Sequence, residues 1–170
     1  SSGDTVFQSS EGTKFRLNSA ILKAASTVFE GMFAMPRDPN EPTDSPITLE
    51  EKTKVLSFMF NCVFPTNTTE HLQDYEEVWE VVEAAEKYDM PSVLKILKLF
   101  VLADVELRED SLKLFAVASH CGWRDVVRTS SNSSLSKDIS NYQNIHILKK
   151  AKSSDVFSLL ELHWKRKEVL

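Results

Sequence analysis

The sequence predicts an α+β fold in which a small β-sheet is flanked by helical hairpins and followed by an α-helical extension. Residues 4–17 hold two β-prone segments, Thr5–Phe7 and Lys14–Leu17, around a turn that contains Gly12. Because glycine adopts positive φ without steric cost, this pattern predicts a β-hairpin. Most of the remaining chain carries apolar residues at helical spacing, which predicts helices around and after the sheet.

Two short helices are expected directly after the hairpin. Asn18 or Ser19 can cap the first helix, since a short side-chain oxygen accepts a hydrogen bond from a free backbone N–H, and Ser26 can cap the second. Helices this short do not persist alone in water, so both must pack into a core. Their apolar positions are Ile21, Leu22, Ala25, Val28, Phe29, Met32 and Phe33.

The next segment predicts a loop, a strand and a helix. Residues 36–46 contain four prolines in a polar, acidic stretch, which is typical of a surface loop. Ile47–Leu49 reads as a third strand. Glu50 and Glu51 favour a helix start, because carboxylates stabilise the positive end of a helix dipole, and Pro65 is expected to end that helix.

Three further helices follow in the pattern. Asp74 and Glu77 have the spacing of a capping box in front of the first. Pro91 suits the first turn of the second, where its missing N–H costs nothing. Residues 107–120 are predicted as one continuous helix that Gly122 stops.

The C-terminal part continues as helices. Residues 123–131 are expected to pair with the preceding helix as a helical hairpin. The polar run at residues 130–134 is expected to break the helical pattern, and Ser153 or Ser154 to cap a last helix.

Composition narrows the class of function. A formal net charge of −5 argues against the basic face of a nucleic-acid-binding protein. No apolar run approaches the roughly 20 residues that span a bilayer, and no secretory leader is visible. Cys62 and Cys121 lie in apolar helical patterns, which favours free thiols in a reducing compartment. We therefore expect an intracellular protein, cytoplasmic or nuclear, that binds neither nucleic acid nor a membrane.

Reactive groups do not converge in the sequence. The four histidines are scattered, and the four glycines leave no phosphate-binding loop. An alternative hydrolase or metal site would use His120, Cys121 or His163, but adjacent helical residues such as His120 and Cys121 do not face each other. We expect no catalytic residues, cofactor, metal or small-molecule substrate.

An ordered set of motifs resembles the BTB/POZ family. Asp4–Phe7, Phe15–Leu22 and Ser26–Phe33 look like the opening of such a domain, and Glu83–Met90 is similar to its alanine-pair-then-KYxM signature. Phe60–Pro65 stands where the family has an apolar helix end and a tight turn. The order of these pieces over about a hundred residues is more specific than any one of them.

The C-terminal region resembles the helical extension that follows BTB domains in many fungal proteins. Asp110–Ala118 is similar to the first extension helix, and Ser154–His163 to the last. The resemblance implies a BTB/POZ domain at residues 1–103 and an α-helical extension at residues 104–170 packed on it.

The resemblance implies a non-enzymatic protein–protein interaction module. Such domains form homodimers, join a cullin scaffold as substrate adaptors in ubiquitin ligases, or recruit transcriptional corepressors. Ser19 departs from the family, which usually has a basic residue there and an acid near Asp4 in a charged pocket; corepressor binding of that type is therefore in doubt. The loop from Met35 to Pro39 matches the family's cullin-binding motif poorly.

The candidate protein interface is the loop after the second helix together with the corner before Pro91. Its residues are Phe33, Met35, Arg37, Asp38, Tyr88, Asp89 and Met90. Tyr88 and Met90 fit a core position equally well. If all apolar faces are internal, the chain is a monomer with no strong partner surface, and this alternative stays open.

Overall fold

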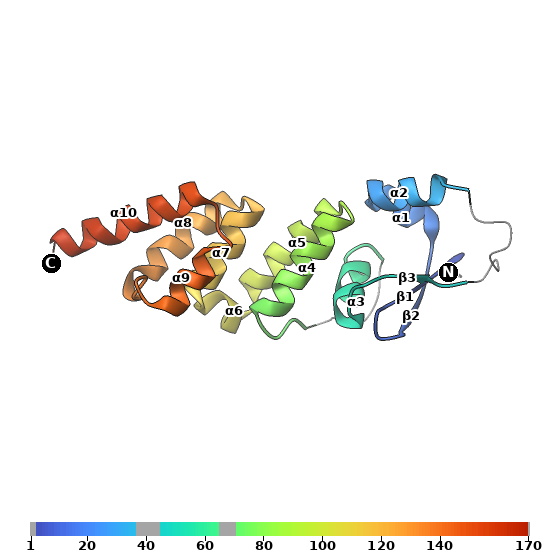
Figure 1. Cartoon of the computed structure of the whole chain (residues 1–170), viewed down its shortest axis with the longest axis horizontal. Coiled ribbons are helices and arrows are strands. Elements are labelled where there is room, and N and C mark those ends of the chain that lie inside the picture. Colours follow the sequence, from blue (N-terminus) through green and yellow to red (C-terminus); the bar gives the residue numbers. More distant parts are fainter. Residues whose placement is uncertain (1–2, 37–44, 65–70, 170) are drawn as a thin grey trace. The chain divides into compact units, whose positions relative to one another are not determined.

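The computed structural model describes residues 3–36, 45–64 and 71–169. Contacts divide the chain into two compact units, residues 1–97 and 98–170. Figure 1 labels the helices and strands of both. A small sheet with helices in the first unit and helices throughout the second confirm the predicted α+β class.

The N-terminal unit contains a three-stranded sheet in the order β2-β1-β3. Strand β1 (Thr5–Gln8) pairs antiparallel with β2 (Lys14–Leu17) and parallel with β3 (Ile47–Thr48). Gly12 takes a φ of +87° in the turn between β1 and β2, a value that other residues rarely adopt. The predictions of the hairpin and of a third strand are confirmed.

Helices α1 (Ser19–Ala25) and α2 (Thr27–Ala34) follow the hairpin. The Asn18 side chain accepts hydrogen bonds from the backbone N–H groups of Ala20 and Ile21, and the Ser26 side chain accepts one from Phe29. Both predicted capping positions are therefore confirmed, with Asn18 as the cap of α1.

Helix α3 (Thr53–Asn61) corrects two predictions. It ends four residues before Pro65, which lies outside the described residues. Its first N–H group, on Thr53, donates to the carboxylate of Glu11 at 2.8 Å. The turn of the hairpin thus supplies the negative charge at this helix start, and Glu51 is bonded elsewhere.

Helices α4 (Tyr75–Lys87) and α5 (Pro91–Ala103) complete the predicted pattern of this region. Asp74 accepts from the N–H groups of Glu76 and Glu77 at 2.9 and 3.0 Å. Glu77 reaches back to the N–H of Gln73 at 2.6 Å, one residue before the usual partner of a capping box.

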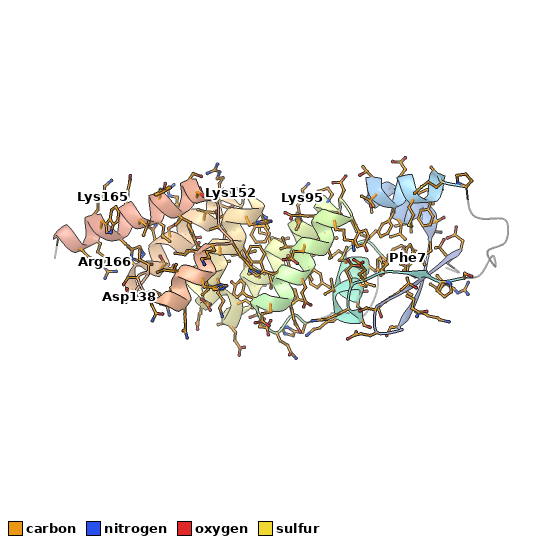
Figure 2. All side chains as sticks on the ribbon, viewed as in Figure 1. Phe7, Lys95, Asp138, Lys152, Lys165 and Arg166 are labelled. Atoms are coloured by element: carbon orange, nitrogen blue, oxygen red, sulfur yellow. The ribbon has the colours of Figure 1, made fainter. Side chains whose placement is uncertain are left out.

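Phe7 is the centre of the N-terminal core (Figure 2). Its ring lies 5.4 Å from that of Phe29, 6.2 Å from that of Phe33 and 5.9 Å from that of Phe60, measured between centroids. The sheet, the α1–α2 hairpin and α3 therefore meet at one buried aromatic cluster. Edge-on contacts such as Phe7–Phe29 add about 0.5–1.5 kcal/mol beyond the area buried.

The described residues of the C-terminal unit form helices joined by short turns, with no strand among them. After α5 its elements are α6 (Val105–Glu109), α7 (Ser111–Cys121), α8 (Arg124–Ser133), the 3₁₀ turn η1 (Ser134–Ser136), α9 (Tyr142–Leu148) and α10 (Ser153–Val169). Helices α7 and α8 form the predicted hairpin, and Gly122 ends α7 with a φ of +74°. A core of Leu112, Phe115, Leu148 and Leu159 joins α7, α9 and α10.

The single helix predicted for residues 107–120 is wrong. Asp110 interrupts it with non-helical backbone (φ −80°, ψ 76°) and accepts a hydrogen bond from the N–H of Lys113 at 3.4 Å. An aspartate that caps the following helix competes with continuous helix, so α6 and α7 are separate.

The serine-rich run at residues 130–134 does not break the helix where it was expected to. Helix α8 continues through Ser133, with the hydroxyl of Ser130 bonded to the carbonyl of Val126 at 2.7 Å and that of Ser131 to the carbonyl of Val127 at 2.6 Å. Serine is tolerated within a helix when its hydroxyl bonds back to the preceding turn.

The start of α10 also differs from the expected serine cap. Ser153 is already helical, and the carbonyl of Lys152 accepts from Val156 as the cap residue does. The N–H of Lys152 donates to the hydroxyl of Ser119 on α7 at 2.9 Å, and that hydroxyl donates to Asp155 at 2.7 Å. A distant residue therefore fixes this helix start.

Candidate interaction surfaces

The first candidate surface surrounds the corner between α4 and α5. Asp89 has a φ of +48°, in the left-handed region, which turns the chain between the two helices. The N–H of Met90 donates to the carbonyl of Ala85 at 2.8 Å and closes the end of α4. Residues 88–90 thus form a hydrogen-bonded corner.

The junction of α1 and α2 packs against this corner, 62 positions away in the sequence. The Ser26 hydroxyl donates to the carbonyl of Tyr88, and the Thr27 hydroxyl donates to the carboxylate of Asp89. The rings of Phe29 and Tyr88 are stacked, with centroids 4.9 Å apart and planes at 10°. Ser26, the predicted cap of α2, therefore also joins two segments that are distant in the sequence.

A polar network lies beside the same corner. Glu51 accepts from the Tyr88 hydroxyl at 2.6 Å and from the Lys87 ammonium at 2.8 Å, and Lys87 also bonds Glu50 at 3.0 Å. Burial acts to raise the pKa of Glu51, but these two donors outweigh it and leave the pKa below its ordinary value. The hydrogen bond to Glu51 raises the pKa of Lys87, whereas burial, followed by that same carboxylate, raises the pKa of Tyr88.

The structure places the seven predicted interface residues in different environments. Met35 is 64% exposed, Asp89 is exposed and Phe33 is half-buried. Tyr88 and Met90 are buried, so their described contacts are those of the core. Arg37 and Asp38 lie outside the described residues. Whether any of the seven contacts a partner stays a prediction.

The outer face of the α1–α2 hairpin is a surface that the sequence pattern did not separate from the core. Ile21 is 38% and Val28 42% exposed, although Leu22 and Phe29, their neighbours in the chain, are fully buried. Both helices therefore carry apolar residues on two sides. The sequence indicates this face in one way: the apolar residues of the two helices cover more of the helix circumference than a single buried face requires.

Asp4 and Ser19 meet at the place where the charged pocket was expected to be incomplete. The carboxylate of Asp4 accepts from the Ser19 N–H at 2.7 Å and from the Ser19 hydroxyl at 2.6 Å. These hydrogen bonds, the hydroxyl first, lower the pKa of Asp4. The carboxylate of Asp4 is thus bonded locally by Ser19.

A buried serine–histidine pair in the C-terminal unit was not predicted. The hydroxyl of Ser134 lies 3.1 Å from Nε2 of His163 and donates to the carbonyl of Ser131 at 2.7 Å. The hydroxyl proton is therefore already used, so Nε2–H of His163 is the donor between the two side chains. Both side chains are buried, so the pair holds η1 against α10.

Metal sites and membrane spans each need particular features of the described residues. No group of three or more His, Cys, Asp or Glu residues among them is placed to hold a metal ion. Within the same residues, no helix combines the length and apolar character that crossing a membrane requires.

Comparison with known families assigns the chain. The model of the BTB/POZ domain matches residues 2–104, which is more than half of the sequence. The chain therefore belongs to the BTB/POZ family, as its motifs indicated, and carries a protein–protein interaction module of a kind that is generally not catalytic. No curated protein sequence gives a significant match.

Proposed function

We propose that this BTB/POZ protein self-associates through the outer face of the α1–α2 hairpin. The observation that carries the proposal is the exposure of Ile21 on α1, of Val28 on α2 and of Met35 directly after α2, while Leu22 and Phe29 on the same two helices are buried. Exposed apolar side chains favour association, because covering them removes apolar area from solvent.

The rest of this face suits a close, symmetric contact. Ala20, Ala24 and Gly31 are exposed on the same hairpin, and a Cβ added to Gly31 would meet no atom within 4 Å. Residues 19–34 include two charged side chains, and one of them, Lys23, lies over the Phe33 ring at 5.6 Å. A two-fold dimer brings one patch against its own copy, which a largely uncharged surface permits.

The test is a charge placed on the exposed side of α2. Val28→Glu should reduce self-association in sedimentation velocity, because the contact would have to bury two carboxylates across the two-fold axis. Ile96→Glu, at a residue 39% exposed on α5, is the matched control and should leave association unchanged. Equal association of both variants with the wild type would remove the α1–α2 face from the proposal.

A second candidate function is a substrate adaptor for a cullin scaffold. The observation that favours it is the end of α2, where Met35 is 64% exposed beside the predicted loop and could anchor a partner. Met35→Ala and charge reversal at Arg37 should weaken a cullin pull-down. Leu99→Ala, at a residue 66% exposed, is the control, and unchanged cullin capture by the Met35 and Arg37 variants would move the contact elsewhere.

We further propose that residues 1–103 are the BTB/POZ domain and residues 104–170 its helical extension, of the type found in many fungal proteins. Support for this boundary comes from the family match, which ends at residue 104, and from the end of α5 at Ala103.

A further inference from the structure

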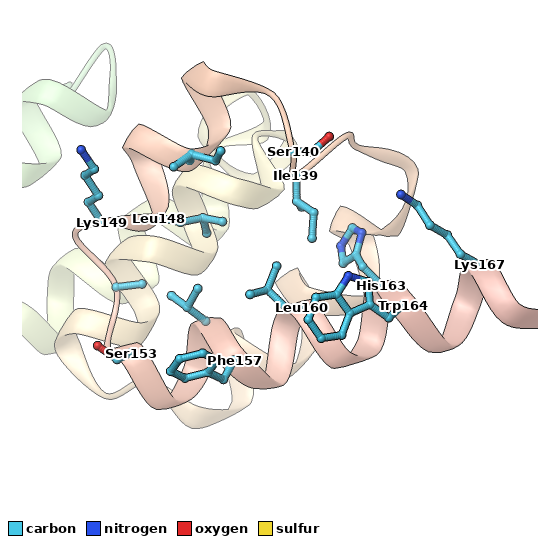
Figure 3. Close-up of a pocket in the computed structure, with 13 residues that line it drawn as sticks. Ile139, Ser140, Leu148, Lys149, Ser153, Phe157, Leu160, His163, Trp164 and Lys167 are labelled. Carbon is cyan, nitrogen blue, oxygen red and sulfur yellow. The ribbon is translucent and has the colours of Figure 1, made fainter.

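An apolar groove lies in the C-terminal unit between α9 and α10 (Figure 3). Its volume is about 580 Å³. Ile145 and Leu148 of α9 form one wall, and α10 forms the other. Phe157 is 68% and Trp164 59% exposed on α10, a large aromatic surface to leave in water.

The spacing of the α10 residues in the groove is that of a helix–helix seam. Ser153, Phe157, Leu160, Trp164 and Lys167 all line it, and their positions alternate by four and three residues. This repeat of 3.5 residues is the one with which a helix offers a continuous stripe to a partner helix. Over this span α10 rises about 21 Å, long enough for four turns of an occupant.

The other side of α10 is already occupied. Leu159 is buried and belongs to the core with Phe115. His163 lines the groove beside this side, and it is itself buried and bonded to Ser134. The stripe with Phe157 and Trp164 is therefore a second apolar face. A small polar ligand would need unpaired polar groups converging on the groove, whereas the histidine here has a partner.

The charged residues that line the groove indicate which kind of helix it can bind. The lining includes Lys149 and Lys167 and no acid, and Figure 3 shows these two lysines at opposite ends of the apolar lining. Residues 98–170 carry 12 basic and 9 acidic side chains, although the whole chain has a net charge of −5. A helix with carboxylates at both ends of an apolar stripe would pair with both lysines.

We propose that this groove binds an acidic amphipathic helix of a partner protein. The occupant places apolar side chains at a 3.5-residue period against Phe157, Leu160 and Trp164, in the manner of helix-in-groove recognition. Its carboxylates lie toward Lys149 and Lys167. This site is independent of the self-association proposed for the α1–α2 face.

The test is selection from a display library of 20-residue peptides against the full chain. Apolar residues are fixed at i, i+4, i+7 and i+11, and the flanking positions vary among Asp, Glu, Lys, Arg and Ser. Peptides that also bind the Phe157→Ala/Trp164→Ala variant are removed. The selected peptides should be rich in Asp and Glu at both ends and should protect amides of α9 and α10 from hydrogen exchange.

Charge variants then test the ends of the groove. Lys149→Glu/Lys167→Glu should weaken the selected acidic peptides at least about tenfold, the loss expected for an interface hot spot, while Arg128→Glu on α8 should not. Enrichment without acidic bias, failure to enrich over the aromatic variant, or equal loss with Arg128→Glu would overturn the proposal. Light scattering that shows dimers lost only on Trp164→Ala would make the occupant a second copy and would also overturn it.

Discussion

Ser26 serves two structural purposes with one hydroxyl. It caps α2 by accepting from Phe29 and holds the α4–α5 corner by donating to the carbonyl of Tyr88. Asn18 makes the comparable cap of α1 but has no such described tie across the fold. Loss of the Ser26 hydroxyl therefore leaves the distant carbonyl of Tyr88 without this donor, whereas loss of the Asn18 side chain affects N–H groups of α1.

Ser26→Ala should lower the free energy of unfolding by about 3 kcal/mol, since it removes a cap and leaves a buried carbonyl without its donor. Asn18→Ala, the control, should cost about 1 kcal/mol. Urea denaturation of the two variants measures both values. A Ser26→Ala loss no larger than that of Asn18→Ala would mean that the bond to Tyr88 contributes nothing.

The lowered pKa of Glu51 predicts how the free energy of unfolding changes with pH under acidic conditions. Its pKa is lowered in the folded state from the ordinary value of 4.5, so its contribution is present above pH 4.5 and is lost as the pH falls through the folded pKa. The difference in unfolding free energy between wild type and Glu51→Gln should therefore be constant near neutral pH and shrink below pH 4.5.

The control for this pH dependence is Glu83→Gln, at an exposed position of α4. An equal pH dependence in this variant would show that any change from carboxylate to amide produces it. A Glu51→Gln curve that runs parallel to the wild-type curve down to about pH 3 would show that the bonds from Lys87 and Tyr88 do not favour the charged carboxylate.

Among the elements, α10 depends on α7 for its start. Ser119 is fully buried and bonds both Lys152 and Asp155, whereas the equally buried Ser130 bonds a carbonyl of its own helix. The two serines are similarly buried, but Ser119 joins two helices and Ser130 bonds within its own helix. Comparing them therefore separates the effect of a hydrogen bond between helices from that of a local one.

Ser119→Ala should cost about 2–3 kcal/mol, because the N–H of Lys152 and the carboxylate of Asp155 lose a buried partner. Ser130→Ala should change stability by no more than about 0.5 kcal/mol, since alanine is the better helix former and the carbonyl keeps its helical donor. Urea unfolding of each variant gives the comparison, and equal losses would contradict the assignment of the two roles.

The elements also show what a sequence can predict. The hairpin at Gly12, the caps at Asn18 and Ser26 and the start of α5 at Pro91 were predictable, because each signal lies within a few residues of its effect. The start of α3 was not, since its acid is Glu11, 42 positions away from Thr53. Helix α9 was not predicted, although with seven residues it is as long as α1.

The candidate surfaces follow the same rule. Val28 and Phe29 are both apolar, and only the packing of the α1–α2 hairpin decides that Phe29 is buried and Val28 exposed. In the sequence, Tyr88 fits a core position and an interface position equally well. Its stacking on Phe29 and its hydrogen bond to Glu51 show that it is a core residue. On α10 the last helix was predicted, but its two apolar faces became distinct only with the position of α9.

At the scale of the molecule, the net charge of −5 is the sum of two units with opposite net charges. Residues 1–97 carry 8 basic and 16 acidic side chains, a net charge of −8, while residues 98–170 carry +3. Each unit also has a core of its own, around Phe7 in the first and Leu112 in the second. This organisation leads to a prediction about the proposed boundary.

A fragment that ends at Ala103 should unfold cooperatively in urea, because the Phe7 cluster lies wholly within it. It should be at most slightly less stable than the same region in the full chain, since the ion pair that Lys98 loses with Asp125, an N···O distance of 2.7 Å, is largely exposed. Circular dichroism during the titration measures both properties. A fragment that unfolds gradually, without a transition, would contradict the boundary.

The central claim is that the working part of this protein is a surface at which copies of the chain meet. Multi-angle light scattering across a concentration series tests it most directly. The account predicts that the mass rises with concentration toward twice the 19.3 kDa of one chain. A mass that stays at 19.3 kDa over the whole range would contradict it.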